Sequence, residues 1–398
     1  GKSLNVDDTF HATEVGIYFG EEGKKVSDPY FCGDGPDRTG CDACAACMIG
    51  CPNGAKNTLD KNYLYFAKKW GAKIFPETKV VKIIPQENGY RVETNKTTSF
   101  FGQNGPSFIG KKVILSAGVI GTLDILLKNK DVYNTLPNIS KKLGDTVRSN
   151  NESLTAATSL NPNVVMSKGI AIGAAVHPDE YTKIEGVRYP KGSDLLRFLA
   201  VPLTGKGNWI TRPIKLLFEI LKNFLKVTRL FFKRDWASST LILLVMQSFE
   251  TNMKLKLGRN LLTCFRLGIK GEPNEGHAVP SYIPIAQQAT KVLANNIDGV
   301  PQNVATEVLA QTPATAHILG GGIISSNAET GVVDTNHEVF GHPGLYICDA
   351  SIIPSNLAVN PSLTITALAE RFSSKFRENK EMKEGWAAPE INYSGATP

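Results

Sequence analysis

The chain has 398 residues, of which 42% are hydrophobic and 20% are charged. This composition excludes a disordered chain or a fibre and is that of a globular protein with a sizeable core. The net charge of +7 comes from one segment, because residues 206–234 hold eight basic side chains and one acid while the rest is neutral. Nucleic acid is therefore not an expected partner, and the local basic segment needs its own explanation.

The first sixty residues are rich in Gly, Asp and Cys and are expected to form mostly loops. The chain begins with Gly rather than Met, and its first thirty residues lack a basic segment followed by an apolar run. No signal peptide is therefore predicted, and we interpret the chain as a fragment cut at its N-terminus. The compartment stays open, with a cytoplasmic or peripheral membrane location favoured.

Five of the seven cysteines fall within the loop 32–51, which indicates a local site rather than a secreted disulfide scaffold. Cys41, Cys44, Cys47 and Cys51 have the CxxCxxCxxxCP spacing that bacterial ferredoxins use for an iron–sulfur cluster. A second such run is absent, so Cys32 would be the only spare ligand nearby. An iron–sulfur cluster, a zinc ion, and structural or redox thiols remain alternatives.

Clear secondary-structure signals begin at residue 59 with a helix that is expected to end at Gly71. Strands are predicted at 79–84, 90–94 and 111–118, separated by turn residues. Gly118 and Gly121 then open a second helix. A strand, a glycine turn and a helix in this order allow a phosphate or cofactor edge to approach the backbone closely.

The middle and the end of the chain differ in the clarity of their patterns. Residues 151–310 hold apolar and alternating runs that favour a mostly antiparallel sheet. Residues 331–341 and 344–351 read as strands, and a helix follows in which Asn360 is the expected N-cap and Pro361 the first helical residue. The positive end of that helix suits the electron-rich edge of a flavin ring.

These last segments carry a family resemblance. HILGGG (317–322) and GVVDTNHEVFGHPGLYICDASIIPSNLAVNPSLTITALAERF (331–372) resemble the C-terminal part of the glucose-methanol-choline (GMC) oxidoreductases, most closely the cholesterol oxidase-like branch. Three upstream blocks match in family order: GAKNTLDKNYL (54–64), VILSAGVIGTLDILL (113–127) and NTLPNISKKLGD (134–145). Both ends of the chain match well and the middle matches poorly.

The resemblance implies an α/β fold, mixed with α+β features, in which a discontinuous FAD-binding domain holds an inserted substrate domain. Its expected parts are residues 1–150 with the Cys-rich loop 32–51, a substrate domain at 151–305 of antiparallel sheet plus helices, and a return to the FAD domain at 306–398. No GxGxxG fingerprint follows an early strand. The phosphate-binding part is thus expected to precede the chain, which alone should bind FAD poorly.

The resemblance also implies the site residues. His317 and Asn360 correspond to the family's catalytic pair, and Val81, Gly118, Asp349, Ala350, Asn360 and Pro361 correspond to positions that contact FAD. The chain departs from the family at Ile318, where a proline is usual. Cholesterol oxidases contribute a carboxylate from a region that does not align; Glu250 is a candidate that we leave outside the site.

The implied function is an FAD-dependent oxidoreductase that transfers a hydride from a sterol-like or long-chain alcohol to flavin N5. The resemblance implies that His317 acts near the substrate hydroxyl as a base or hydrogen-bond partner, a role that suits imidazole because it titrates near neutral pH. The electrons would pass to O₂ or to another acceptor. One alternative is a flavin and iron–sulfur dehydrogenase of alcohols or sugars, and another, of a different class, is an inactive or electron-carrying fragment whose cysteine loop is the working site.

The basic segment is expected to include an amphipathic helix at 213–233. At about 100° per residue, Lys215, Glu219, Lys222, Lys226, Arg229 and Lys233 form one narrow stripe on an otherwise apolar helix. Two interpretations remain open. The helix is half-buried with the stripe as its solvated edge, or it lies in an anionic membrane surface with its lysines reaching outward.

Overall fold

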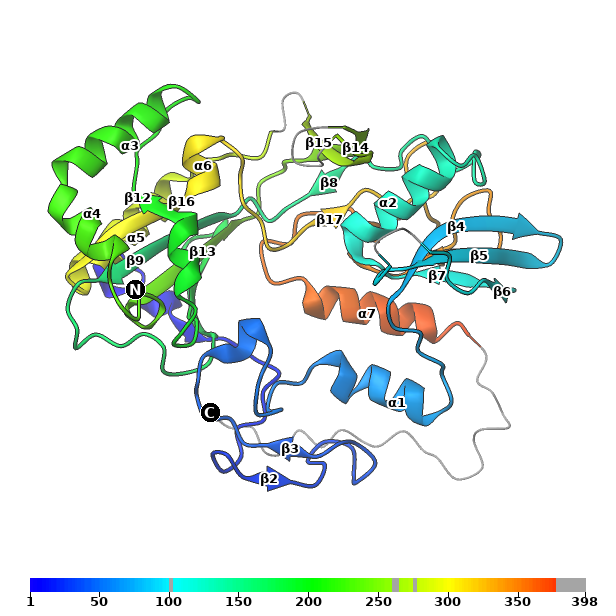
Figure 1. The fold of residues 1–398 in the computed structure, drawn as a ribbon, viewed down its shortest axis with the longest axis horizontal. Helices are drawn as coiled ribbons and strands as arrows, with labels where there is room; N and C mark the ends of the chain where they lie inside the picture. Colours follow the sequence, from blue (N-terminus) through cyan, green and yellow to red (C-terminus); the bar gives the residue numbers. More distant parts are fainter. Residues whose placement is uncertain (100–102, 260–264, 275–277, 377–398) are drawn as a thin grey trace.

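The computed structural model describes residues 1–99, 103–259, 265–274 and 278–376. It confirms a mixed α/β fold with the predicted antiparallel sheet in the middle of the chain. In Figure 1 this sheet and its helices form one side of the molecule, and the elements around α2 form the other. The segment that holds β2 (Lys25–Val26), β3 (Arg38–Thr39) and α1 (Tyr63–Lys69) lies below both.

The larger sheet has seven strands in the order β1-β10-β11-β13-β9-β16-β12, and every described pairing is antiparallel. Their bounds are β1 (His11–Ala12), β9 (Ser153–Ser159), β10 (Ile172–Asp179), β11 (Thr182–Val187), β12 (Ala200–Pro202), β13 (Thr240–Gln247) and β16 (Gly299–Val304). The first strand thus pairs with the middle of the chain. The division at residues 150 and 305 remains a prediction.

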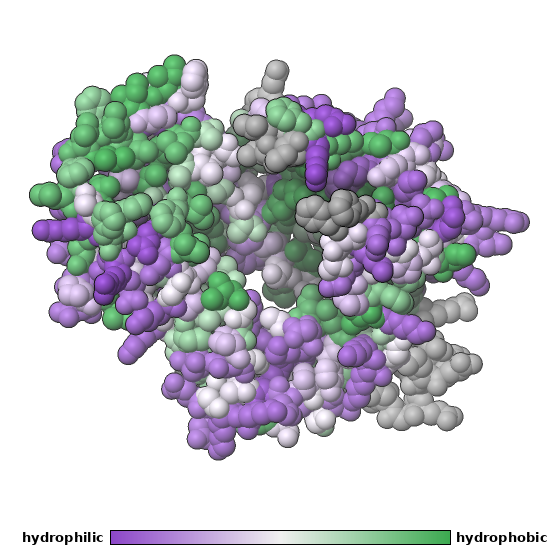
Figure 2. All heavy atoms as spheres, in the orientation of Figure 1, coloured by the Kyte–Doolittle hydropathy of each residue, from purple (hydrophilic) through white to green (hydrophobic). Residues whose placement is uncertain are grey.

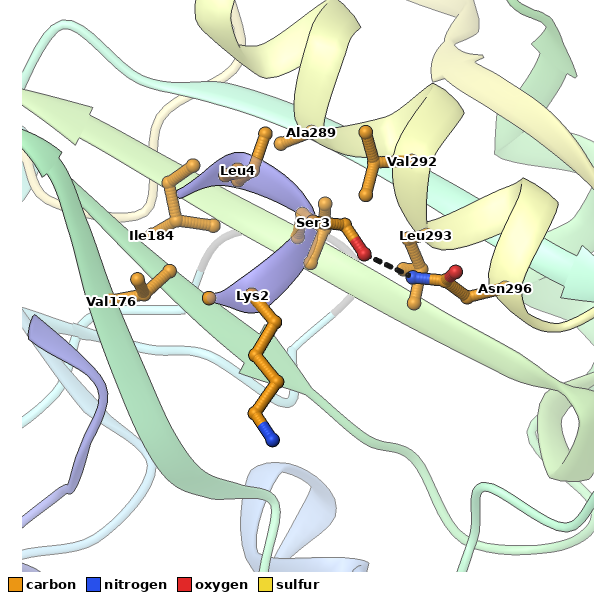
Figure 3. Close-up of a pocket in the computed structure, with 11 residues that line it drawn as sticks. Lys2, Ser3, Leu4, Val176, Ile184, Ala289, Val292, Leu293 and Asn296 are labelled. Carbon is orange, nitrogen blue, oxygen red and sulfur yellow. Dashed lines mark hydrogen bonds between the residues drawn. The ribbon is translucent and has the colours of Figure 1, made fainter. Parts of the chain in front are cut away.

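One face of this sheet packs on helix α5 (Pro284–Asn296). Ile184 of β11 faces that helix, so Glu185, its neighbour in an alternating strand, faces the opposite side. Figure 3 shows Leu4 lying in the groove between the sheet and α5, while Ser3 accepts a hydrogen bond from Asn296. The first residues of the chain therefore line a pocket that contains none of the predicted site residues.

The other side of the molecule is built around α2 (Gly118–Asp131). Its buried residues Val119, Thr122, Leu123, Leu126 and Leu127 follow the three-and-four spacing of a single helix face. This face covers the parallel pair β7 (Val113–Leu115) and β18 (Leu345–Ile347). The antiparallel sheet β4 (Thr78–Gln86), β5 (Gly89–Lys96) and β6 (Phe108–Gly110) lies beside them.

A four-stranded antiparallel sheet also packs on the α2 side. Its order is β15 (Gly268–Pro273), β14 (Met253–Gly258), β8 (Val147–Arg148) and β17 (Leu319–Gly320). The other elements are β2 (Lys25–Val26), β3 (Arg38–Thr39), α1 (Tyr63–Lys69), α6 (Ala305–Leu309) and α7 (Ser362–Ser373). Tyr63 donates a hydrogen bond to Glu370, which joins α1 to α7 where Figure 1 shows them side by side.

Two predicted helices differ from the sequence expectation. The helix expected from residue 59 begins at Tyr63, because Asn62 accepts a hydrogen bond from the Tyr63 N–H and caps it. The single helix expected at 213–233 is two helices, α3 (Thr211–Lys222) and α4 (Phe224–Phe231). At Asn223 the backbone leaves the helical conformation (φ −112°, ψ 27°), and the Asn223 side-chain amide donates to the Glu219 carbonyl and carboxylate.

Candidate active site

His317 is brought to the site by a short strand pairing. Leu319 pairs with Arg148 and Gly320 with Val147, so β17 and β8 run antiparallel. The residues that follow β8 therefore lie against those that precede β17. This register places Glu152 next to His317, although 165 positions separate them.

Glu152 holds His317 through a short hydrogen bond. The Glu152 Oε1 lies 2.6 Å from His317 Nδ1, and its Oε2 accepts the Ala316 N–H. The Glu152 side chain is fully buried, so water does not compete for its oxygens. An ionised carboxylate can only accept a hydrogen bond, so the Nδ1 of His317 carries the proton and donates it. Nε2 is then the unprotonated nitrogen of the neutral ring and can accept a hydrogen bond from another group.

Asn360 is held by a second buried carboxylate. Its Nδ2 lies 3.0 Å from both oxygens of Glu185, whose side chain is fully buried. Lys183 approaches the same carboxylate at 2.9 Å and balances its charge. Glu185 can reach Asn360 because it lies on the face of β11 opposite α5.

Asn150 ties the two carboxylate-held residues together. Its Oδ1 accepts the N–H groups of Leu357 and Ala358, and its Nδ2 donates to the Val359 carbonyl at 2.8 Å. Asn150 is completely buried and lies two residues before Glu152. The loop that ends at Asn360 is thus fastened to the segment that positions His317.

Three of the predicted cofactor-contacting residues meet at the carboxyl ends of β7 and β18. Gly118 follows β7, and Asp349 and Ala350 follow β18, which is the edge where ligands bind in parallel α/β sheets. Asp349 accepts hydrogen bonds from Thr122 of α2 and from the Ser351 backbone and hydroxyl. Both its oxygens are therefore engaged, and it fixes α2 to the end of β18.

This edge has room for a flavin. Gly118 adopts a left-handed conformation (φ 71°), and a Cβ built there would meet no described atom within 4 Å. Leu363, in the first turn of α7, is 81% exposed, so the N-terminal end of that helix is also open. Figure 2 shows a hollow in the centre of the molecule, between the two sides and the N-terminal segment. The residues present fit the FAD that the resemblance implies.

The start of α7 differs from the expected cap. Asn360 does not accept an N–H of the helix, because its amide donates to Glu185 instead. Pro361 takes the N-cap position with φ −81°, and its carbonyl accepts the Ile365 N–H. The Asn360 side chain therefore does not cap the helix and points to Glu185 instead.

Two other predicted positions lie apart from this group. Val81 is the bulged residue of β4, and its carbonyl accepts a hydrogen bond from Asn129. Its contact with FAD stays a prediction. The candidate Glu250 forms an ion pair with Arg148 and is 73% exposed, whereas Glu152 and Glu185 are the buried carboxylates beside His317 and Asn360.

Sequence patterns did not single out these two carboxylates. Glu185 lies in a strand whose alternation places it on the face away from α5, but its partner is remote in sequence. Glu152 belongs to the polar run Ser149–Asn150–Asn151–Glu152 between two apolar segments, and all four residues are buried. A polar run that leads into a strand of the sheet was the signal that could have found Glu152. If such residues are buried, each of them requires a specific hydrogen-bond partner.

The cysteine loop does not form a metal centre in the described residues. Among them, no group of three or more His, Cys, Asp or Glu side chains is placed to hold a metal ion. Cys41, Cys44, Cys47 and Cys51 are free thiols. The loop is instead fixed to a distant segment, because Gly169 exchanges backbone hydrogen bonds with Ala43 and Ala45. The arrangement does not fit the predicted cluster, and we derive no chemistry from one.

The thiols of this loop differ in acidity. Burial raises the pKa values of Cys41 and Cys44. Burial alone would also raise the pKa of Cys51, but hydrogen bonds from the backbone N–H groups of residues 53–56 lower it.

Comparison with known proteins identifies the family. Models described as GMC oxidoreductase match residues 35–147 and 254–369. A cholesterol oxidase of Acinetobacter baumannii is 42% identical over 96% of this chain and 70% of its own length. The chain therefore belongs to the GMC oxidoreductase family of FAD-dependent oxidoreductases.

Other relatives are consistent with this assignment. A cholesterol oxidase of Mycobacterium tuberculosis is 40% identical over 93% of this chain and 66% of its own length. A long-chain-alcohol oxidase of Arabidopsis thaliana is 25% identical over 85% of the chain and 47% of its own length. A solved structure of an Aspergillus oryzae formate oxidase covers 79% of this chain with 14% identity and a TM-score of 0.51, and the chain covers 62% of it. That likeness concerns the fold alone.

Proposed function

We propose that the enzyme containing this chain oxidises a sterol-like or long-chain alcohol, with His317 and Asn360 as its catalytic pair. The observation that carries the proposal is that two fully buried carboxylates, Glu152 and Glu185, each hold one of these side chains. Burying two carboxylates is costly, and arrangements of this kind are typical of catalytic sites rather than of ordinary cores.

His317 would take the proton of the substrate hydroxyl. Glu152 accepts a hydrogen bond from the Nδ1 N–H, so Nε2 is the nitrogen available for this step. As His317 becomes positively charged, the fixed negative charge of Glu152 stabilises it without any rearrangement. A positioned base of this kind contributes roughly 10²–10⁴-fold to a rate.

Asn360 would orient the same reaction from the other side. Both oxygens of Glu185 contact its Nδ2, so its Oδ1 faces away from that carboxylate and can accept a hydrogen bond from the substrate or another bound group. FAD, when bound, supplies the two-electron acceptor for the hydride of the carbinol carbon. Gly118, Asp349, Ala350 and Pro361 are the residues of this chain that would border it.

The substrate class and the electron acceptor rest on the relatives. The curated proteins named above are oxidases of cholesterol or of long-chain alcohols. We infer from this that the substrate is a hydrophobic alcohol and that O₂ is the acceptor.

The test is a steady-state assay of the FAD-loaded enzyme. Cholesterol, a C16 alcohol and glucose are offered separately while peroxide and oxygen are followed. Peroxide formed with the first or second substrate, and lost in both His317→Ala and Asn360→Ala, is the expected result. Turnover of a dye acceptor without oxygen consumption would replace O₂ by another acceptor, and unchanged turnover in His317→Ala would refute the catalytic pair.

A further inference from the structure

The two helices of the basic segment present an unusual surface. Helix α3 buries Arg212 and Leu216 and exposes its large apolar side chains. Ile214, Leu217, Phe218 and Leu221 follow the i, i+3, i+4, i+7 spacing of one helix face. Phe218 is 66% exposed and Leu221 is 62% exposed. The apolar face of the helix therefore points to solvent, opposite the side that packs on the protein.

The apolar surface continues beyond α3. Leu225 of α4 is 71% exposed, and Trp209, just before α3, is equally exposed. Phe198 contacts Phe231 edge to face, with ring centres 5.7 Å apart, and Phe231 contacts Phe232. Figure 2 shows hydrophobic residues gathered over the end of the molecule where Figure 1 places α3 and α4. We call this the α3–α4 surface: Leu195, Phe198, Leu199, Trp209, Ile210, Ile214, Leu217, Phe218, Leu221, Phe224, Leu225, Phe231 and Phe232.

This surface is rigidly built. Arg197 donates hydrogen bonds to the carbonyls of Phe231 and Lys233, which fastens the segment containing Phe198 to the end of α4. Buried Arg212 donates to the carbonyls of Ser281 and Glu307, which fixes the start of α3 to the body of the protein. The apolar side chains are thus displayed on an anchored support.

Cations border the same surface on one side. Lys215 and Lys222 of α3 are exposed and lie about 90–110° around the helix axis from its apolar face, and Lys226 of α4 is exposed too. Arg229 and Arg234 are also exposed. The earlier alternative, in which the basic stripe is the only solvated edge of a half-buried helix, is wrong because the apolar face is exposed as well.

We propose that the α3–α4 surface docks on a membrane that contains anionic lipids. An exposed apolar face bordered by lysines matches the layering of such a membrane, with acyl chains inside and negative headgroups at the edge. A second copy of this chain would bring the same cations against each other. None of the helices in the described parts of the chain is long and apolar enough to cross a bilayer, so docking is interfacial.

The start of α3 is joined to the segment that precedes His317 in the chain. Gln311 donates a hydrogen bond to the carbonyl of Gly207, just before α3, and Arg212 donates to the carbonyl of Glu307. The α3–α4 surface is thus attached to the protein through residues 307–311.

Vesicle binding tests the proposal. The purified chain is sedimented with vesicles of phosphatidylcholine alone and of phosphatidylcholine with 30% phosphatidylglycerol, in ~0.1 M salt. Phe218→Ser, Leu221→Ser and Leu225→Ser together should lower the partition coefficient at least tenfold. Lys215→Gln, Lys222→Gln and Lys226→Gln should lower it about fivefold for each lysine, and only on the anionic vesicles.

Matched controls come from the other side of the molecule. Ile109→Ser removes an apolar side chain that is 80% exposed, and the triple change Lys73→Gln, Lys96→Gln, Lys111→Gln removes three exposed cations. Both should leave binding within twofold. Equal loss in these controls, or no binding of the unchanged chain to either vesicle, would overturn the proposal. A dimer that the three serine substitutions dissociate would assign the surface to self-association instead.

Discussion

Replacing Glu152 by glutamine is the most direct test of the site. The carboxylate accepts two hydrogen bonds, from His317 Nδ1 and from the Ala316 N–H. Glutamine has one acceptor oxygen and one amide donor in the same shape. If its oxygen faces His317, its NH₂ opposes the Ala316 N–H. If the amide is reversed, it donates to Nδ1 and moves the imidazole proton to Nε2, which removes the base.

The magnitude follows from the bond that is lost. A hydrogen bond to a charged group contributes about 1.5–3 kcal/mol, and each 1.36 kcal/mol changes a rate tenfold. Since Glu152 is fully buried, water cannot replace it. We expect Glu152→Gln to lower kcat roughly 10- to 150-fold while KM stays within about threefold.

The assay is initial-rate peroxide formation, with FAD content and thermal unfolding measured on the same samples. Glu250→Gln is the matched control, because that side chain is 73% exposed and pairs with Arg148. It should leave kcat within twofold of the unchanged enzyme. A kcat of Glu152→Gln within threefold of the unchanged enzyme would refute the positioning role, provided that His317→Ala is inactive under the same conditions.

Three further predictions concern stability. Asn360→Asp should lower the free energy of unfolding by about 2 kcal/mol or more, and more at pH 8 than at pH 5, because it sets a second carboxylate against buried Glu185. Burial raises the pKa of Glu307 to about 7 from 4.5. Glu307 in the folded protein keeps its proton to a higher pH than in the unfolded chain. The free energy of unfolding therefore falls by about 3 kcal/mol as the pH rises from about 4.5 to about 7. Glu307→Gln should remove that loss in urea unfolding at pH 5 and pH 8. Gly320→Ala should cost about 3 kcal/mol, because φ is 79° and the new Cβ would lie 2.3 Å from the Thr146 carbonyl.

Each of these three has its own control or contrary result. An Asn360→Asp effect that does not change with pH would argue against charge repulsion. A stability profile of Glu307→Gln parallel to that of the unchanged chain would contradict the raised pKa. Gly23→Ala is the control for Gly320, since Gly23 also has a positive φ but a Cβ there meets no described atom within 4 Å. Its cost should be only about 1 kcal/mol.

Local patterns predicted the elements that have a single strong signal. Strands β4 and β5, helix α2 and the final helix all appear near their predicted positions, because their apolar spacing matches one structural period. The basic segment was predicted as one helix because its spacing continues across Asn223. The break is the non-helical backbone of Asn223, whose side chain bonds to Glu219, and periodicity does not register it.

The resemblance placed His317 and Asn360 in the site, yet nothing in the sequence connected them with Glu152 and Glu185. Those contacts join residues 165 and 175 positions apart. They depend on the register of β8 with β17 and on the face that β11 presents, and register is a property of the assembled sheet. In the cysteine loop, the spacing of the cysteines predicted metal ligands. The conformation of the loop instead depends on backbone hydrogen bonds with Gly169, which is remote in sequence.

The sequence by itself determined the family and the mixed α/β class, because motifs and apolar periods are local and survive without knowledge of contacts, and it predicted His317 and Asn360 as the catalytic pair. Only the tertiary structure decided which carboxylates hold that pair and which face of α3 meets solvent. Both depend on how distant segments pack: two buried acids are tolerated where specific donors surround them, and Phe218 and Leu221 are exposed because Arg212 and Leu216 occupy the buried side of the same helix.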